Sequence, residues 1–523
     1  MYSNGLLASC LLAGAAAAIG VPAAAAEIPV DWHLRRSQLA EPVSASCVQA
    51  CAQLSATFPS SRFHYPSNDT TFTIWDAKQQ EVRPACRVEP TNASDVSLIL
   101  KTLVDNWCHF AVKGGGHSRN AGDSNSIAGV TVDLDRMNSV EVVSNGTGTP
   151  TRARVGGGAT VIQVYQALEG SKLSYVGGRS ATVGIGGFTL GGGTSPFSSR
   201  YGWALDNVYE YEVVLANGTI TTASETHNQD LYFALRGGSN NFAIVTTFTV
   251  RIFPQDAVSS QRATYTTANQ TESALDAIHD LFTNPQLTDD MDMAYDFYYI
   301  YNQASGAFSL MGSEWYANPA VVEPEVFEAI RGVPSTMRTA RLGSMANLTG
   351  TLQPPVLGTT RHLFGTISTL PSRALLTQAL AIFREEVSAI SAVEGLAPNL
   401  ICYPLSTTAI QAMKQRGGNA LGIDQDEPLY IFLVSTAWSN AQDDAAVERM
   451  TANVLSRMES FAQESEIAHP YLYINYASAA QTDKIFAGYG EENVRRLKAV
   501  AGEVDPDGVF SSEGLWRGFV KLL

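Results

Sequence analysis

The sequence lacks the short motifs that mark several common enzyme classes. It has no G-x-x-x-x-G-K-[ST] phosphate loop, no HExxH and no paired CxxC, so we expect no bound metal ion. Gly116-His117-Ser118 does not match the G-x-S-x-G nucleophile elbow of α/β-hydrolases. Gly184 and Gly186 begin a G-x-G-x-x-G dinucleotide fingerprint, but Thr189 replaces its third glycine and no helix pattern follows directly. A Rossmann-type site is therefore not predicted.

Positive charge is scarce as well. The 523 residues include 34 Lys and Arg against 50 Asp and Glu, which gives a net charge of −16. This balance argues against nucleic acid and anionic membranes as partners, because both favour a basic face. No segment after the N-terminus has the length of a transmembrane helix. The acidity is equally well explained by solubility, and the length predicts two or three domains.

The N-terminus is rich in alanine and leucine. Residues 1–26 are expected to be a signal peptide that ends at the A-x-A site Ala24-Ala25-Ala26, although no Lys or Arg precedes the apolar stretch. Six N-x-[ST] sequons follow, which favours a eukaryotic secretory route for a soluble, glycosylated protein. The sequon asparagines are Asn68, Asn92, Asn145, Asn217, Asn269 and Asn347.

Cysteine usage is compatible with secretion. Once Cys10 is removed with the signal peptide, Cys47, Cys51, Cys86 and Cys108 form a cluster in the sequence. They can form two disulfides in any of three connectivities, or remain partly as buried thiols. Cys402 stands apart and is interpreted as a core residue.

The character of the chain changes near Pro254. Before it, short strands and helices alternate, and Asn217-Gly218 predicts a tight hairpin turn. From residue 254 to about 469, helices mix with long alternating strands, which predicts an antiparallel sheet covered by helices. The tail 470–523 contains a predicted strand at 471–480 and a helix at 490–504, and is too short to fold alone.

Five segments of this chain carry a resemblance to a known family. They are AVKGGGHS (111–118), VGGRSATVGIGGFTLGGGTSPFSSRYGWALDNV (176–208), LRGGSNNFAIVTTFTV (235–250), YINYA (473–477) and VDPDGVF (504–510). In this order they resemble the FAD-linked oxidases of the vanillyl-alcohol oxidase and PCMH-type superfamily. The branch is the berberine-bridge-enzyme-like group of fungal secreted type.

The resemblance implies an α+β fold. A PCMH-type FAD-binding domain of two α/β subdomains would occupy 27–253 and receive the tail, 470–523. A substrate domain with an antiparallel sheet covered by helices would be inserted at 254–469.

The resemblance also implies FAD bonded through its 8α-methyl to His117, which holds the cofactor and raises its reduction potential. Many relatives have a second link, through a cysteine at the position of Ser180. A serine hydroxyl cannot form that thioether, so a single covalent link is expected. The missing link favours a smaller or more apolar substrate. Phe188 is a second departure, because many relatives have histidine there.

Further flavin contacts follow from the same resemblance. Residues expected along the pyrophosphate and isoalloxazine are Lys113, Gly114, Gly115, Gly116, Ser118, Ser180, Thr182, Val183, Gly184, Gly186 and Gly187. Those expected near the adenosine and the ring are Asp206, Val208, Ile244 and Val245, with Asn475 at the flavin edge. Bare glycine backbone admits a pyrophosphate closely, although such glycines also serve tight turns.

Tyr476 is the candidate catalytic base, because several relatives use the tyrosine of this NY pair. Its pKa of about 10 would have to fall for that role; the alternative is a tyrosine with a solvated hydroxyl. Arg119 and Arg179 are candidates for positive charge near the flavin. Pocket candidates on the substrate sheet are Tyr295, Tyr299, Tyr301, Glu314 and His362.

The resulting hypothesis is a secreted, monomeric FAD oxidase acting on a small secondary metabolite. A carbon bearing a hydroxyl gives hydride to the flavin, and O₂ accepts the electrons to form H₂O₂, in some family members with ring closure. Three alternatives remain: a carbohydrate oxidase, a flavin-binding protein with little activity, and a dehydrogenase that uses another electron acceptor.

Overall fold

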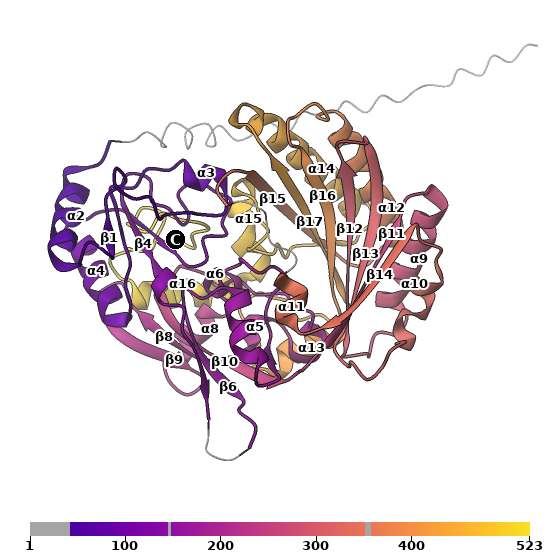
Figure 1. Cartoon of the computed structure of the whole chain (residues 1–523), viewed down its shortest axis with the longest axis horizontal. Coiled ribbons are helices and arrows are strands. Elements are labelled where there is room, and N and C mark those ends of the chain that lie inside the picture. The colour runs from indigo at the N-terminus through magenta and orange to yellow at the C-terminus, as the bar shows by residue number, and fades with distance from the viewer. Residues whose placement is uncertain (1–41, 145–147, 351–356) are drawn as a thin grey trace, which may run out of the picture.

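The computed structural model describes residues 42–144, 148–350 and 357–523 (Figure 1). The predicted signal peptide and the Asn145 sequon lie outside these residues. Within them, no helix combines the length and apolar character needed to cross a membrane. Three sheets form the architecture, and each has its own helices and buried core.

The first sheet follows the order β1-β2-β4-β3, and β2, β4 and β3 are parallel. Disulfides join Cys47 to Cys108 and Cys51 to Cys86, which resolves the connectivity that the sequence left open. Asn92 begins α4 by accepting the Asp95 N–H. The elements are α2 (Ala45–Thr57), β1 (Phe63–His64), α3 (Ala77–Gln80), β2 (Cys86–Val88), α4 (Ala93–Asp105), β3 (Phe110–Lys113) and β4 (Val130–Asp133).

The second sheet has the order β5-β6-β10-β8-β9, and β7 also pairs with β10. The hairpin turn at Asn217-Gly218 is confirmed: Gly218 has φ +78° and donates to the Leu215 carbonyl at 2.8 Å. The elements are β5 (Val140–Val143), β6 (Arg152–Gly156), α5 (Val161–Glu169), β7 (Leu173–Tyr175), α6 (Ile185–Leu190), α7 (Ser198–Tyr201), β8 (Val208–Val214), β9 (Ile220–Ser224), α8 (Gln229–Leu235) and β10 (Ile244–Pro254). The short helix α6 does follow Gly184 directly, contrary to the sequence interpretation.

The third sheet is antiparallel, with eight strands in the order β14-β11-β13-β12-β16-β17-β15-β18. Helices α9, α12 and α14 cover its outer face, which confirms the predicted arrangement (Figure 1). The strands are β11 (Val258–Tyr265), β12 (Met293–Asn302), β13 (Ala307–Tyr316), β14 (Met337–Gly343), β15 (Arg361–Thr369), β16 (Ala397–Leu405), β17 (Leu429–Trp438) and β18 (Ala468–His469). The helices are α9 (Ala268–Thr283), α10 (Glu328–Gly332), α11 (Met345–Gly350), α12 (Arg373–Ser388), α13 (Thr407–Gln415) and α14 (Asp444–Glu464).

The tail returns to the first two sheets, where α15 (Thr482–Ile485) and α16 (Glu491–Val504) pack. The strand predicted at 471–480 is wrong. Residues 471–478 form no strand, because a turn and a side chain satisfy their backbone: Tyr476 N–H donates to the Tyr473 carbonyl at 2.8 Å, and Arg119 binds two neighbouring carbonyls.

Candidate active site

A cavity of about 670 Å³ lies between the glycine loop, the glycine-rich segment, the tail and the third sheet. Its size is typical of a site for a cofactor or other small molecule. The glycine loop, Gly114–Ser118, directly follows β3. It therefore lies at the carboxyl end of the parallel strands, where α/β folds bind ligands.

Two glycine segments meet backbone to backbone at this cavity. A Cβ on Gly115 would lie 2.3 Å from Gly184 N, and a Cβ on Gly184 would lie 2.2 Å from Gly115 N. Gly116 has φ +66°, a conformation that favours glycine. A Cβ on Gly187, which lines the cavity, would meet no atom of another part of the chain within 4 Å. The glycines therefore allow close chain packing at one point and leave a bare wall at another.

Alanine substitutions at three glycines separate these roles. Gly115→Ala is expected to lower both thermal stability and FAD content, because backbone must move to admit the methyl group. Gly187→Ala is expected to keep its thermal stability but lose FAD, because its methyl enters only the cavity. Gly170→Ala, outside the cavity and with open space around it, is the control. Wild-type FAD content in Gly187→Ala would contradict a cofactor against this wall.

His117 stands at the end of the glycine loop and contacts Thr182 and Trp75. Its Nε2 is 3.2 Å from Thr182 Oγ1, and its ring stacks on Trp75 with centroids 3.9 Å apart. The other face of Trp75 stacks on His362, also at 3.9 Å. Burial lowers the pKa of His117 to about 3, and the charges of His362 and Arg119 act in the same direction. The imidazole is therefore neutral at physiological pH, and its ring is fixed in place.

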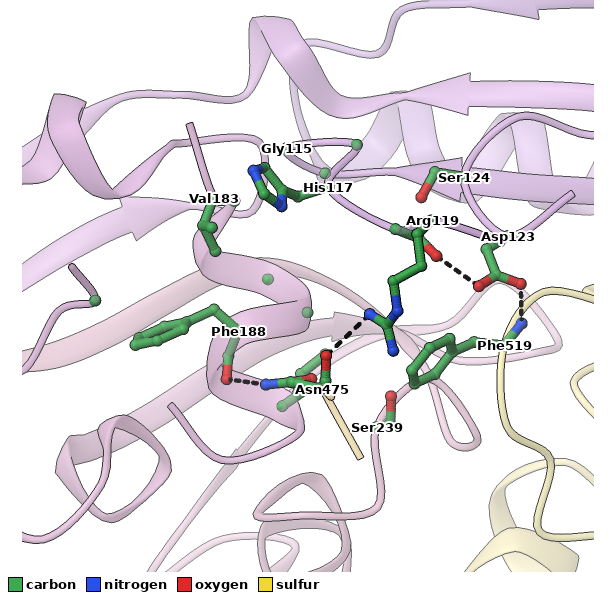
Figure 2. A pocket seen from close by; sticks show the side chains of 18 of the residues that line it. Gly115, His117, Arg119, Asp123, Ser124, Val183, Phe188, Ser239, Asn475 and Phe519 are labelled. Carbon is green, nitrogen blue, oxygen red and sulfur yellow. Dashed lines mark hydrogen bonds between the residues drawn. The ribbon is translucent and has the colours of Figure 1, made fainter. Parts of the chain in front are cut away.

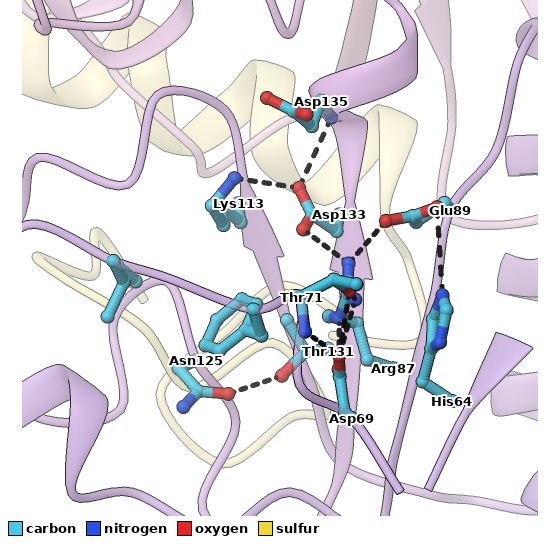
Figure 3. Close-up of polar contacts among 12 residues, drawn as sticks. His64, Asp69, Thr71, Arg87, Glu89, Lys113, Asn125, Thr131, Asp133 and Asp135 are labelled. Carbon is cyan, nitrogen blue, oxygen red and sulfur yellow. Dashed lines mark hydrogen bonds and ion pairs between the residues drawn. The ribbon is translucent and has the colours of Figure 1, made fainter. Parts of the chain in front are cut away.

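A buried ion network supports the glycine loop from behind (Figure 3). Lys113, the last residue of β3, donates to Asp133 Oδ1 at 2.9 Å. Arg87 donates to the other oxygen of Asp133 at 3.0 Å and also pairs with Asp69 and Glu89. These pairs hold the carboxyl ends of β2, β3 and β4 together. The Lys113 side chain is thereby engaged in the network and does not line the cavity.

Most of the predicted cofactor residues do line the cavity. They are Gly114, Gly115, Gly116, His117, Ser118, Ser180, Val183, Gly184, Gly186, Gly187, Ile244, Val245 and Asn475. Thr182 contacts His117 but, like Lys113, Asp206 and Val208, does not line the cavity. Asp206 instead accepts the Trp203 N–H at 2.9 Å and pairs with Arg236 at 3.3 Å, a structural role away from the cavity.

The tail brings Asn475 (Figure 2) and the adjacent Tyr476 to the cavity wall. Asn475 Nδ2 donates to the Phe188 carbonyl at 3.1 Å, and its own carbonyl accepts Arg119 at 2.9 Å. The Tyr476 ring lies 5.5 Å from Tyr403 and 6.4 Å from Phe364, between centroids. Aromatic residues of the third sheet and of the tail thus surround one phenol.

Tyr476 lies in a strongly desolvated position. Burial raises its pKa well above 10, and the neighbouring Tyr403 and Tyr473 act in the same direction. Arg179 and a hydrogen bond with Thr194 lower it. The cation expected from the sequence is therefore present, but the effect of burial on the pKa is larger than that of Arg179.

The third sheet presents a different set of side chains from the one expected. Successive residues of a strand alternate between its faces. Tyr295, Tyr299 and Tyr301 of β12 point into the core beneath the covering helices, and Asp296 and Tyr298 lie on the face toward the cavity. Glu314 of β13 pairs with Arg331 at 2.8 Å. Of the five pocket candidates on this sheet, only His362 lines the cavity.

Several cavity residues lie outside the motifs recognised in the sequence. They include Trp75, Asp123, Phe364, Tyr403, Trp516 and Phe519. Trp516 and Phe519 come from the tail, and Phe519 N–H donates to Asp123 at 2.8 Å (Figure 2). No local pattern marks them, because their positions depend on how the tail docks.

The cavity fits an FAD cofactor on two observations. Side chains in place of the glycines of its wall would fill part of the cavity. Trp516 Nε1 and Arg119 Nε are buried without a hydrogen-bond partner. Buried donors of this kind are normally satisfied, so they indicate a polar ligand. Within the ranges the structure describes, no group of three or more His, Cys, Asp or Glu side chains is arranged to hold a metal ion.

Comparisons with known proteins identify the class. The FAD binding domain family model matches residues 84–224. The FAD-dependent monooxygenase tpcD of Cochliobolus heterostrophus is 35% identical, over 89% of this chain and 93% of its own length. The bifunctional solanapyrone synthase of Alternaria solani is 29% identical, over 92% and 89%.

Solved structures agree on the fold. Physcomitrella patens BBE-like 1 has a TM-score of 0.71 at 20% identity, covering 91% of this chain and 99% of its own. The glucooligosaccharide oxidase of Acremonium strictum, with a 6-S-cysteinyl, 8α-N1-histidyl FAD, has a TM-score of 0.70 at 20% identity and the same coverage.

This protein is a flavoenzyme with a PCMH-type FAD-binding fold. It belongs to the same family of FAD-binding enzymes as the fungal FAD-dependent monooxygenase tpcD.

Proposed function

We propose that this flavoenzyme is an oxidase that removes hydride from an alcohol-type carbon of a small metabolite, with O₂ as electron acceptor. The observation that carries the proposal is the convergence of His117 and Tyr476 on one cavity. The first is a neutral nucleophile suited to a covalent flavin link, and the second is a buried phenol suited to proton transfer.

FAD bound in this cavity would accept hydride from the substrate and pass two electrons and two protons to O₂, giving H₂O₂. The glycine loop and the segment Val183–Gly187 would hold the cofactor, with His117 as its single covalent link. Ser180 lines the cavity, where a hydroxyl offers no second thioether. Tyr476 would bind the substrate hydroxyl and receive its proton.

The cavity wall formed by the third sheet favours an apolar, ring-bearing substrate over a sugar. Its lining side chains include no carboxylate and no amide. They are Tyr298, His362, Phe364, Ile401, Tyr403, Leu433 and Ser435. Recognition of many sugar hydroxyls would require more polar partners than this wall supplies.

We further propose that the protein is secreted and monomeric, with the FAD-binding domain at 27–253 and 470–523 and the substrate domain at 254–469. The two disulfides are consistent with an oxidising compartment. The chain passes from the second to the third sheet between Pro254 and Val258.

Reoxidation of the holoenzyme by air tests the oxidase assignment. Dithionite-reduced protein is expected to regain its oxidised flavin spectrum within seconds of mixing with air and to form one H₂O₂ per flavin. A panel of hydroxylated aromatic metabolites and oligosaccharides, assayed for peroxide, then identifies the substrate class. Slow reoxidation with rapid reduction of a quinone dye would instead indicate a dehydrogenase.

A further inference from the structure

Two arginines line the cavity, the buried Arg119 and the partly buried Arg179, and their charges are balanced differently. Arg179 Nε lies 3.0 Å from Asp296 Oδ1, and Asp296 is fully buried. Arg119 donates only to neutral groups, the backbone carbonyls of Asn475 and Ala477. Among the described residues, no carboxylate lies within ion-pair distance of Arg119. Among the described residues, Arg179 thus has a carboxylate partner at ion-pair distance, whereas Arg119 has none.

The nearest carboxylates around Arg119 are engaged elsewhere. Asp123 accepts the Ser118 hydroxyl at 2.6 Å and the Phe519 N–H at 2.8 Å. Asp76 accepts the His362 backbone N–H at 2.7 Å and begins α3. Figure 2 shows the Arg119 side chain extending away from Asp123 toward Asn475. The guanidinium is therefore positioned by the tail and by Phe364, whose ring centroid is 4.7 Å from its central carbon.

This cation retains unused capacity for a ligand. Burial lowers the pKa of Arg119 to about 10, which still leaves it protonated at neutral pH. Its Nε is buried without an acceptor, although the residue lines the cavity. A buried charge without a counter-ion is costly, and an anionic group in the cavity would offset that cost.

We propose that Arg119, and not Arg179, supplies the positive charge that stabilises the reduced flavin; this rests on FAD occupying the cavity as proposed above. The substrate carbon gives the flavin a hydride, which is two electrons and one proton, while the hydroxyl proton goes to the base. The ring system therefore gains one negative charge, which a nearby fixed cation favours. O₂ then takes up two electrons and two protons as H₂O₂.

Sulfite is the probe for this charge, because it needs no substrate. Its sulfur lone pair forms one bond to a flavin ring nitrogen, and the ring takes up the negative charge. In the holoenzyme, Arg119→Met is expected to weaken sulfite binding at least about tenfold, or about 1.4 kcal/mol. The two-electron midpoint potential is expected to fall by about 30 mV, which corresponds to the same factor.

Matched variants separate charge from packing. Arg119→Lys keeps the charge and is expected to retain sulfite affinity within about threefold. If Arg119→Met does not hold FAD, Arg119→Gln replaces it as the neutral variant that is compared with Arg119→Lys. The double variant Arg179→Met with Asp296→Asn removes a neutral pair and is expected to change sulfite affinity little. Unchanged affinity in Arg119→Met, or a larger loss in the double variant, would overturn the proposal.

Failure of the oxidase assignment has a different signature. Slow reoxidation of the wild-type flavin by air, together with a tenfold loss of sulfite affinity in Arg119→Met, would reject the oxidase but support the role of Arg119. Rapid reoxidation of the wild-type flavin, together with unchanged sulfite affinity in Arg119→Met, would support the oxidase but reject the role of Arg119.

Discussion

Replacing His117 with alanine is expected to abolish covalently bound flavin, so that acid precipitation leaves a colourless pellet. The wild-type pellet is expected to stay yellow. His117 is the cavity imidazole at the glycine loop, fixed by Thr182 and Trp75. Flavin fluorescence of the denatured band and the mass of the intact chain measure the link.

Ser180→Ala is the matched control, because Ser180 lines the same cavity and is expected to carry no link. It should retain the full covalent flavin of the wild type. A yellow, denatured His117→Ala protein would show that another residue carries the flavin.

The pH dependence of flavin attachment tests the state of His117. Its pKa of about 3 means that the imidazole stays neutral as the pH falls past 6.5, where an ordinary histidine gains a proton. Attachment of FAD to the apoprotein should therefore proceed at similar rates between about pH 8 and pH 5. A rate that falls with a midpoint near 6.5 would show that His117 is not buried and neutral when it reacts.

Replacing Tyr476 with phenylalanine is expected to slow flavin reduction about 10²- to 10⁴-fold, the usual contribution of a positioned acid or base. The substitution keeps the ring contacts with Tyr403 and Phe364 and removes only the hydroxyl. Anaerobic stopped-flow reduction, with the substrate found in the peroxide assay, measures the effect.

Tyr403→Phe is the control, since it removes a neighbouring hydroxyl from the same cavity. Its effect should be less than about tenfold if Tyr476 is the base. Near-normal flavin reduction in Tyr476→Phe would refute the assignment.

The direction of the pH effect follows from burial. Because the pKa of Tyr476 lies well above 10, most molecules hold the protonated phenol at neutral pH. The reduction rate should therefore rise with pH across the range in which the enzyme is stable. This rise should disappear in Tyr476→Phe. A pH-independent wild-type rate would indicate that another group takes the proton.

Most residues of the two glycine segments that the sequence singles out do line the cavity, because the geometry of these segments is encoded locally. A glycine is needed where Gly115 and Gly184 touch, and the motif around His117 is contiguous. The whole fold followed from the order of such motifs along the chain.

The substrate side was predicted poorly for a physical reason. Strand β12 is largely buried on both faces, so apolar and aromatic residues occur at both its odd and its even positions. Because polar and apolar residues do not alternate regularly along β12, the sequence does not indicate which of its residues face the cavity. A shift of the assignment by one residue exchanges the residues on the cavity face with those on the core face. Tyr295 and Tyr299 were chosen where Asp296 and Tyr298 lie. Lys113 does not line the cavity, because its side chain pairs with Asp133 of another strand, a partner that local sequence does not reveal.

The docking of the tail has a consequence for biosynthesis. Phe519 binds Asp123 across 396 positions of the chain, and Phe519 and Trp516 complete the cavity wall beside the glycine loop. A ribosome must therefore release nearly the whole chain before a complete cavity can form. FAD is therefore expected to bind only after synthesis of the chain is nearly complete. A chain truncated before Trp516 would lack part of the cavity wall and is expected to reach cellular quality control without its cofactor.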